Sequence, residues 1–229
     1  HEGIYKSTNG GGSWSAANAG LTNTIDRVLV IDPLTHTTLY AGTEDGVFKS
    51  TNGGGSWSAV NTGLTHTDVR SLAINPLTPT TLYSGTNGGG VFKSTNGGGN
   101  WSIVKTATWY VTIDALAIDP TTPTTIYLGT NYDGVSKSTN GGGDWNTVNT
   151  GLTATTVRAL AIDPVTPTTL YAGTYLGTVY KSTNSSGDWS AVNNGLEANY
   201  IMALLIDPMT PTTLYAGTWG SMFKTTNGG

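Results

Sequence analysis

The sequence predicts an all-β fold, a five-bladed β-propeller of four-stranded antiparallel blades. The 229-residue chain repeats itself with a period of about 44 residues, which is typical of propeller blades. Each repeat holds four short runs rich in Val, Ile, Leu, Thr and Tyr, separated by Gly, Asn and Pro, as expected of strands and turns. No apolar stripe of helical period persists across the 32 glycines, so we expect almost no helix. One blade cannot bury both of its faces, whereas a ring of blades can.

One repeat shows the four expected strands in order. Strand A is the run 69–74, strand B is 81–86, strand C is 90–94, and strand D begins at Trp101. The chain begins with a C and a D run and ends with A, B and C runs. It therefore contains five copies of A, B and D but six copies of C.

Residues 1–229 are expected to form a single propeller domain. We expect the ring to close where the N-terminal strand D, around Trp14, pairs with the C-terminal strands, so that the two chain ends share one blade. One copy of strand C, either 4–7 or 222–225, is then surplus. The surplus, and a start at His1 rather than Met, favour a piece excised from a longer tandem array. The alternative is that the two ends compete for one edge.

The amino-acid composition limits the kinds of partner that the chain can bind. Charged residues make up 10% of the chain, against roughly 25% in ordinary soluble domains. The net charge is −4 and no Lys/Arg cluster occurs, so we expect no nucleic-acid partner. No apolar run is long enough for a membrane helix, and no membrane insertion is expected. Cysteine is absent, which excludes disulfides and Cys-ligated zinc. No cofactor is indicated, and the low charge with abundant Thr, Asn and Gly favours an extracellular or cell-surface location.

A turn motif joins strands C and D in every repeat. It reads STNGGGSW at residues 7–14 and returns four more times with small changes. The motif resembles the Asp-box, or BNR, repeat Ser-x-Asp-x-Gly-x-x-Trp, with Asn in place of the box Asp. Families that share this repeat include sialidases, xyloglucanases and sortilin-type receptors, so the resemblance implies the propeller fold and leaves the function open.

The box residues are expected to be structural. An Asn can fold its side-chain oxygen onto backbone amides of a turn, and the repeated Trp is expected to pack in the core between blades. Each box offers a single amide oxygen where a calcium loop has several carboxylates, so no metal site is predicted. The fifth box has Ser186 where Gly is expected. The residues assigned to the structural box are Asn9, Asn52, Asn96, Asn140, Asn184, Trp14, Trp57, Trp101, Trp145 and Trp189.

The repeats differ mainly in the D–A and B–C connections, which lie at one end of the blades in an up-and-down meander. All aromatic residues outside the repeat pattern fall there, and exposed Trp and Tyr are typical of recognition surfaces and suit stacking on sugar rings. The alternative is that some of them plug the axial channel, or that loops tolerate drift. The predicted ligand-binding aromatic residues are Trp109, Tyr110, Tyr132, Tyr175, Tyr200 and Trp219.

Arg27, Arg70 and Arg158 occupy one repeat position, where the third repeat has Asp114 and the fifth has Met202. We expect a series of ion pairs near the channel mouth. The alternative is a carboxylate-binding site, because the guanidinium fork suits carboxylates, and these arginines therefore join the predicted ligand-binding residues.

The sequence favours a non-enzymatic extracellular binding module with lectin-like carbohydrate recognition on the D–A/B–C loops. The alternative is a structural, assembly or protein-interaction propeller of a surface repeat protein that binds a protein ligand or self-associates through the surplus strand.

The remaining alternative is a glycoside hydrolase. A sialidase-like enzyme would use the three arginines with Tyr200 and Glu197, and the resemblance implies that xyloglucanase-like enzymes need two propellers with a cleft between them. No catalytic residue is assigned, because the carboxylates of the variable loops show no evident pairing. They are Glu44, Asp45, Asp68 and Asp133.

Overall fold

A computed structural model describes residues 3–23, 26–197 and 200–229. The expectations for His1 and for the loop positions 24–25 and 198–199 lie outside this range. The described residues form strands, turns and irregular segments without a helix, as the sequence predicts, and accordingly hold no helix that could cross a membrane.

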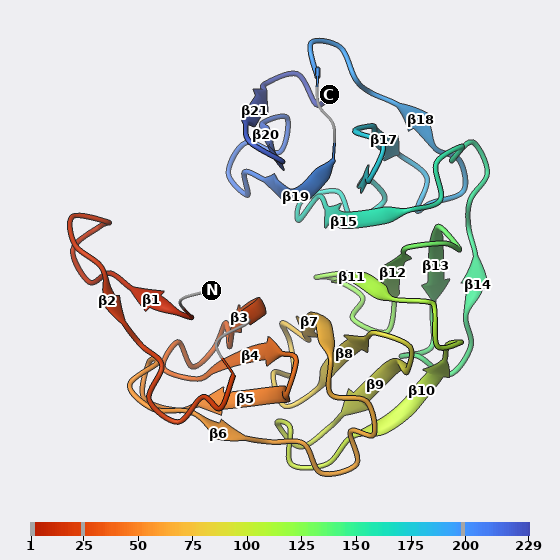
Figure 1. Ribbon diagram of the computed structural model, residues 1–229. Coiled ribbons are helices and arrows are strands. Elements are labelled where there is room, and N and C mark those ends of the chain that lie inside the picture. Colours follow the sequence, from red (N-terminus) through yellow and green to blue (C-terminus); the bar gives the residue numbers. More distant parts are fainter. Residues whose placement is uncertain (1–2, 24–25, 198–199) are drawn as a thin grey trace. The chain divides into compact units, whose positions relative to one another are not determined.

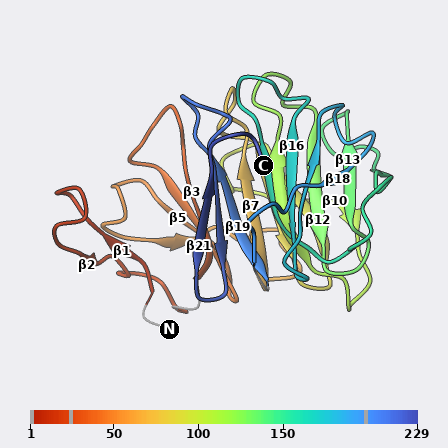
Figure 2. The same cartoon turned by 90° about the horizontal axis from the view of Figure 1, so that it is seen from above.

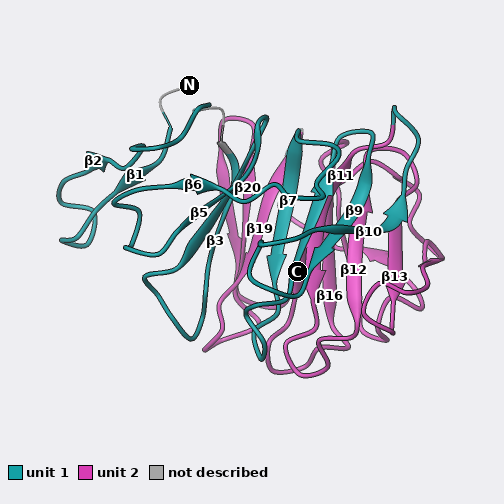
Figure 3. Ribbon diagram, turned by 90° about the horizontal axis from the view of Figure 1, so that it is seen from below, with its two compact units in different colours: residues 1–110 teal, residues 111–229 magenta. Residues whose placement is uncertain are grey.

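The chain folds into two compact units, residues 1–110 and 111–229 (Figure 3). In unit 1, β1 pairs with β2 in a two-stranded sheet, and two four-stranded antiparallel meanders follow (Figure 1). Their strands are β1 (Tyr5–Lys6), β2 (Ser15–Ala16), β3 (Asp26–Ile31), β4 (Leu39–Thr43), β5 (Gly46–Ser50), β6 (Ser58–Ala59), β7 (Val69–Ile74), β8 (Leu82–Thr86), β9 (Gly90–Ser94) and β10 (Ser102–Thr106).

Unit 2 contains two four-stranded meanders and one three-stranded meander, which is drawn in dark blue in Figure 2. Its strands are β11 (Ile113–Ile118), β12 (Ile126–Thr130), β13 (Val135–Ser138), β14 (Asn146–Thr147), β15 (Val157–Ile162), β16 (Leu170–Thr174), β17 (Val179–Ser182), β18 (Ser190–Ala191), β19 (Ile201–Ile206), β20 (Leu214–Thr218) and β21 (Met222–Thr225). The five consecutive meanders that begin with β3, β7, β11, β15 and β19 correspond to the predicted blades, with strands A to D in chain order in the first four and strands A to C in the fifth.

The blade that the two chain ends were expected to share differs from the prediction. The strand-D copy β2 pairs with β1, its own neighbour in the chain, and β19, β20 and β21 form a separate three-stranded sheet. A hairpin closes a short loop, whereas pairing the two chain ends closes a loop of nearly the whole chain at a higher entropic cost. Both the N-terminal and the C-terminal copies of strand C are therefore used.

The box turn has one geometry in all five copies. The Asn side-chain oxygen accepts a backbone N–H from the residue four positions on, at 2.8–2.9 Å. The same oxygen accepts the hydroxyl of the Ser two positions before it, at 2.9–3.0 Å. An amide side chain thus holds the turn without a charge, as the sequence predicts.

Three of the five box tryptophans lie in the core. Trp57, Trp101 and Trp189 are 4–5% exposed, and each indole N–H donates to a backbone carbonyl of the preceding repeat at 2.7–2.8 Å. The expectation is wrong for Trp14, which is 64% exposed, because no carbonyl of the described residues accepts its indole N–H.

Trp145 also departs from the pattern, since it is half-buried and its indole N–H donates to Gly142 in its own box at 3.1 Å. The expectation of a core position is therefore met only in part for this residue.

Lysine and tyrosine side chains link consecutive blades inside each unit. The Lys49 ammonium and the Tyr40 hydroxyl both donate to the Gly97 carbonyl, at 3.1 and 3.2 Å. Lys181 and Tyr171 do the same to Gly228, at 2.8 and 3.0 Å. The ammonium groups also lie over the tyrosine rings, so each link combines hydrogen bonding with a cation–π contact.

An Asn-x-Gly-Leu motif after strand D reinforces these links. The Asn61 side chain accepts the Val47 amide at 2.7 Å and donates to Asp45 O at 3.0 Å. Gly63 has φ +83°, and a Cβ there would lie 2.2 Å from the Trp101 carbonyl oxygen, so only Gly fits. The repeat after β10 reads Lys-Thr-Ala-Thr at 105–108 instead, and the boundary between the two units falls directly after this segment.

The fifth box has two serines with positive φ, Ser185 and Ser186, and a substitution at Ser186 should relieve part of the strain. Ser186 has φ 72° and replaces a glycine of φ 85° in the second box, Gly54. A left-handed backbone costs a residue with a Cβ about 1–2 kcal/mol, although glycine gains entropy in the unfolded chain. We therefore expect Ser186→Gly to raise the free energy of unfolding by about 0.5–1 kcal/mol, measured by urea denaturation.

The matched reverse change, Gly54→Ser, should lower the free energy of unfolding by a similar amount. If both substitutions raised, or both lowered, the free energy of unfolding, backbone strain at Ser186 would not explain the result.

Candidate functional site

The D–A and B–C connections meet at one end of the blades within each unit. In unit 1, the Asn87 amide donates to the Asp68 carbonyl at 2.9 Å. In unit 2, the Tyr175 amide donates to the Thr156 carbonyl at 2.9 Å. The backbone thus places the start of each B–C loop beside the start of strand A, and the non-repeating side chains project from this end.

In unit 2, three predicted aromatic residues form a continuous row, which we call the aromatic track: Tyr175, Tyr200 and Trp219. The ring centroids of Tyr175 and Tyr200 are 4.3 Å apart, and those of Tyr200 and Trp219 are 6.3 Å apart with an angle of 70°. Trp219 is 79% exposed. The residues come from two B–C loops and one D–A loop, so folding alone brings them together.

An ion pair anchors one end of the aromatic track. The Arg158 guanidinium carbon lies 5.5 Å from the centre of the Tyr175 ring, within cation–π range. The same guanidinium is 3.6 Å from the Asp114 carboxylate, whose side chain is largely covered. The order of contacts is therefore Asp114, Arg158, Tyr175, Tyr200 and Trp219.

Tyr200 has a rare backbone conformation and a side-chain hydrogen bond to its neighbour in the track. Its φ of 83° is one of three positive values among the described residues other than Gly, and a bulky residue rarely adopts such a backbone. Its hydrogen bond to the Tyr175 side chain raises the pKa of Tyr200.

The position shared by the three arginines is a β-bulge. The pairing of strands A and B shifts register at this residue in every blade, and a bulge re-aims its side chain. Arg27 pairs with Glu44 and Arg70 with Asp68 at 2.6 Å. Each arginine thus has its own carboxylate, in agreement with the expected ion pairs, and none is left to form a sialidase-like triad.

Three predicted aromatic residues lie outside the contacts that define the track. Trp109 and Tyr110 contact one another edge to face in unit 1, with ring centroids 5.7 Å apart. Tyr132 is exposed on the B–C loop of the third blade in unit 2.

Most carboxylates of the described residues form a hydrogen bond or an ion pair that supports the fold. Four bind backbone amides of the A–B turns, two hold box asparagines, three pair with arginine, and Asp45 accepts the Thr22 hydroxyl at 3.0 Å. The first nine are Asp32, Asp119, Asp163, Asp207, Asp144, Asp188, Glu44, Asp68 and Asp114.

Asp133 and Glu197, both exposed in unit 2, have carboxylates with no hydrogen-bond or ion-pair partner in the described part of the chain. The loop of Asp133 lies beside the strand of Arg158, since Gly134 N donates to Thr155 O and the Thr156 hydroxyl donates to Asn131 O, each at 2.9 Å. Within the same described residues, no group of three or more His, Asp or Glu could hold a metal ion.

Sequence reasoning missed one feature of this site. Asp133 was noted among the loop carboxylates but not selected, because only the hydrogen-bond network shows which carboxylates are already engaged. Asp114 was noted as the acidic exception at the arginine position, where ion pairs were expected, and its ion pair with Arg158 agrees with that expectation.

Comparison with known proteins defines the class. No family model and no curated protein matches the chain. It is similar to the crystal structure of an ancestral GH74 enzyme, with TM-score 0.81 and 26% identity over 97% of this chain and 33% of that chain. With this likeness, the chain is a five-bladed β-propeller whose structural neighbours are GH74 glycoside hydrolases.

Two further crystal structures show the same fold at lower identity. The GH74 xyloglucanase from Xanthomonas campestris has TM-score 0.62 and 15% identity over 99% of this chain and 49% of that one. The GH74 enzyme of Niastella koreensis has TM-score 0.62 and 18% identity over 97% and 49%. The chain thus spans a third to a half of the length of these enzymes.

These neighbours overturn the functional expectation drawn from the sequence. A non-enzymatic, lectin-like module was expected, whereas the similar structures are glycoside hydrolases. The prediction was wrong because it required paired carboxylates to be evident in the sequence, and pairing in a propeller depends on loops that are distant along the chain.

Proposed function

We propose that the chain is a propeller of a glycoside hydrolase that acts on a polysaccharide bound along the aromatic track. The observation that carries this proposal is the unbroken series of contacts from Asp114 through Arg158 to Trp219. The ancestral GH74 enzyme supports the reaction class. The xyloglucanase neighbour suggests a β-glucan backbone as the first substrate to test.

The aromatic track suits a sugar polymer for physical reasons. Tyr and Trp rings offer large rigid apolar surfaces with a polar edge, which match the apolar face and equatorial hydroxyls of a pyranose. The ion pair between Asp114 and Arg158 fixes the guanidinium over Tyr175 and so limits the rotamers of the ring. A track ordered before the substrate arrives loses less entropy on binding.

Glycosidic hydrolysis requires two carboxyl groups, one that protonates the leaving oxygen and one that acts on the opposite side of the sugar. Asp133 is the catalytic carboxylate in this proposal, because it is exposed, unengaged and next to the strand that carries Arg158. Glu197, which precedes Tyr200 by three residues, is the second. Water is the co-substrate, and the products are two shorter saccharides, one with a new reducing end.

The five C–D turns belong, in this proposal, to the Asp-box type with Asn in the acidic position. The common hydrogen-bond geometry of the turns supports this assignment. An extracellular location is part of the same proposal, since it would give the enzyme access to a polymeric substrate.

The test is the release of reducing ends from xyloglucan and from an unsubstituted β-glucan by the full chain. Hydrolysis of either polymer supports the proposal. The absence of new reducing ends from both polymers under conditions where the chain is folded would overturn it.

Trp219→Ala is expected to raise KM for the polymer about 2- to 12-fold with little change in kcat, because an aromatic contact contributes about 0.5–1.5 kcal/mol. Uniform loss of ground-state and transition-state binding has this kinetic signature. Met209→Ala is the matched control, since Met209 is an exposed apolar residue in the A–B loop of the same blade. An unchanged KM for Trp219→Ala would remove this residue from the track.

A further inference from the structure

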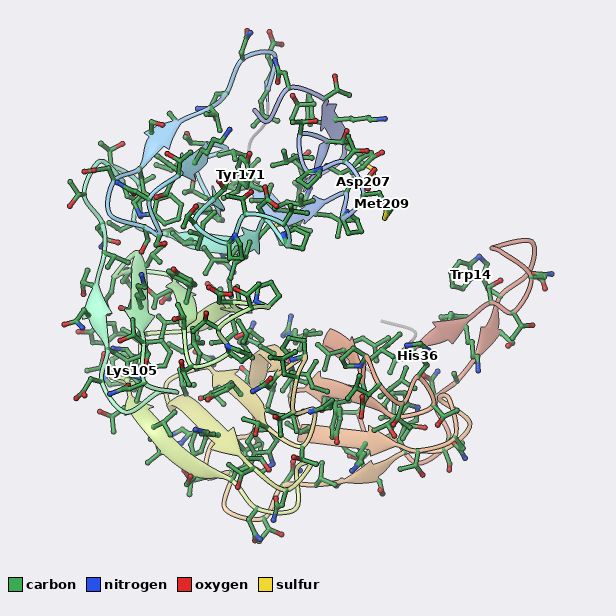
Figure 4. The ribbon with its side chains drawn as sticks, turned by 180° about the vertical axis from the view of Figure 1, so that it is seen from behind. Trp14, His36, Lys105, Tyr171, Asp207 and Met209 are labelled. Carbon is green, nitrogen blue, oxygen red and sulfur yellow. The ribbon has the colours of Figure 1, made fainter. Side chains whose placement is uncertain are left out.

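An apolar groove in unit 2 has the lining of a tryptophan site but contains no tryptophan of the described residues. Its walls are contributed by the fourth and fifth blades, and the residues that identify it are Val192, Leu196, Leu204, Leu214, Ala216 and Phe223. Figure 4 labels Tyr171, which also lines this groove.

The groove repeats the surroundings of Trp189 one blade further along the chain. Trp189 packs in a cluster with Leu152, Leu170, Ala172 and Tyr180, whose positions in the next repeat are Leu196, Leu214, Ala216 and Phe223. The backbone acceptors are repeated too. The Trp189 amide and indole N–H donate to Thr150 O and Val148 O, both at 2.8 Å, and the equivalent Asn194 and Val192 line the groove.

The same blade also has an open strand edge. The meander of β19, β20 and β21 has three strands, whereas the other four blades have a fourth strand that starts directly after the box tryptophan. The outer edge of β21 pairs with no strand of the described residues. Such an edge readily accepts a further strand, so the groove and the edge together fit a segment that contains a Trp followed by a strand D.

The β1–β2 hairpin of unit 1 presents this kind of segment. Trp14 is 64% exposed (Figure 4) and precedes β2 directly. Its box turn has the hydrogen bonds of the buried copies. Within unit 1, β2 pairs with β1, and this pairing leaves the Trp14 side chain available to pack elsewhere.

Some apolar side chains of the first and last blades are much more exposed than the residues at the same repeat positions in other blades. Leu29 is 45% exposed, whereas Leu72 at the same repeat position is 5% exposed. Met222 is 76% exposed, whereas Val91 at its position is fully buried. Both blades therefore leave surface uncovered that the interior blades bury against a neighbour.

We propose that a second copy of this chain inserts its Trp14 and β2 into the groove and pairs β2 with β21. The exchange replaces β1 by β21 as the partner of β2, and these two strands are copies of the same repeat strand. A protruding residue that fits a pocket elsewhere on the same molecule gives a heterologous, head-to-tail contact. The chain is expected to associate stepwise as its concentration rises.

The experiment is sedimentation velocity of the full chain over a range of concentrations, with two variants. Trp14→Ala removes the inserted residue and Leu196→Asp places a charge in the groove, and each variant alone is expected to stay monomeric. An equimolar mixture is expected to form a dimer that grows no further, because it combines one intact groove with one intact Trp14. Trp109→Ala, which changes another exposed tryptophan of unit 1, should associate like the unchanged chain.

Two results would overturn the proposal. One is an unchanged chain that remains monomeric at every concentration. The other is an equimolar mixture that remains monomeric, although it holds one intact groove and one intact Trp14. The first result is the one expected if each chain fills its groove with its own Trp14. Acrylamide quenching of tryptophan fluorescence, compared between the chain and Trp14→Phe, provides a second measurement should Leu196→Asp fail to fold. Quenching of the Trp14 signal must fall as the concentration rises, and a constant value contradicts the insertion.

Discussion

Asp133→Asn is expected to lower kcat for polysaccharide hydrolysis by about 10²- to 10⁴-fold, the usual contribution of a general acid or base. Asn keeps the size of the side chain but cannot exchange a proton at neutral pH. The backbone of Asp133 donates to the Thr130 hydroxyl and accepts from Asn149, and neither contact needs the carboxylate. The loop should therefore keep its conformation, and KM should change little.

The matched control is Asp45→Asn. Asp45 occupies the same repeat position, since both residues precede a Gly-Val pair and both backbone carbonyls accept from the Asn of the Asn-x-Gly-Leu motif. Its carboxylate accepts the Thr22 hydroxyl, so kcat should be unchanged. Initial rates of reducing-end release measure both variants. Retained activity in Asp133→Asn would remove the residue from the chemistry, and equal losses in both variants would indicate a structural effect.

Glu197→Gln tests the second carboxylate of the proposal in the same assay. A loss similar to that of Asp133→Asn is expected, because the two groups act on the same glycosidic bond. Full activity of Glu197→Gln together with an inactive Asp133→Asn would assign the second role to another group and leave the role of Asp133 standing.

Trp101→Ala is expected to lower the free energy of unfolding by about 3–5 kcal/mol, as for other large-to-small changes of buried aromatic residues. Trp101 belongs to the main cluster of unit 1 with Tyr40, Leu64, Leu82 and Phe92. The substitution opens a cavity there and leaves the Val60 carbonyl, which accepts the indole N–H at 2.7 Å, without this donor. Both effects act in the same direction.

Trp14→Ala is the internal control, since it removes the same side chain from the same box position. Trp14 is mostly exposed, so the free energy of unfolding should change by no more than about 0.5 kcal/mol when measured on the monomer. Guanidinium denaturation followed by circular dichroism measures both variants. Similar losses in the two variants would show that Trp14 is buried in solution.

Because the sequence repeats, the strands and turns of the fold could be predicted from individual residues of each repeat. Strands 69–74 and 90–94 were predicted with the bounds that the structure has, because Gly, Asn and Pro interrupt every apolar run. The box asparagines were predicted as turn residues and have that role. Local hydrogen bonding and side-chain periodicity determine such features within a few residues.

The candidate site was only partly predictable. The sequence drew attention to Tyr175, Tyr200 and Trp219 because they interrupt the repeat, but it could not separate them from Trp109 and Tyr110. Their contacts join residues 25 and 19 positions apart along the chain, and no local pattern encodes contacts over such separations. The same holds for Asp133, whose lack of a partner is visible only against the engaged carboxylates around it.

The sequence by itself determined the strands, their order, the turn chemistry and the number of blades, since these follow from local propensity, the 2-residue periodicity of apolar side chains and the number of repeats. Only the tertiary structure decided which tryptophans are buried, which strand pairs with β2, and which loop residues form the track. These outcomes depend on which groups meet after folding, when copies with nearly identical sequences acquire different neighbours. Trp14 and Trp57 show this most directly. Both end the same eight-residue box, STNGGGSW, but Trp57 packs in a core cluster with Ala41 and Phe48 whereas Trp14 is 64% exposed.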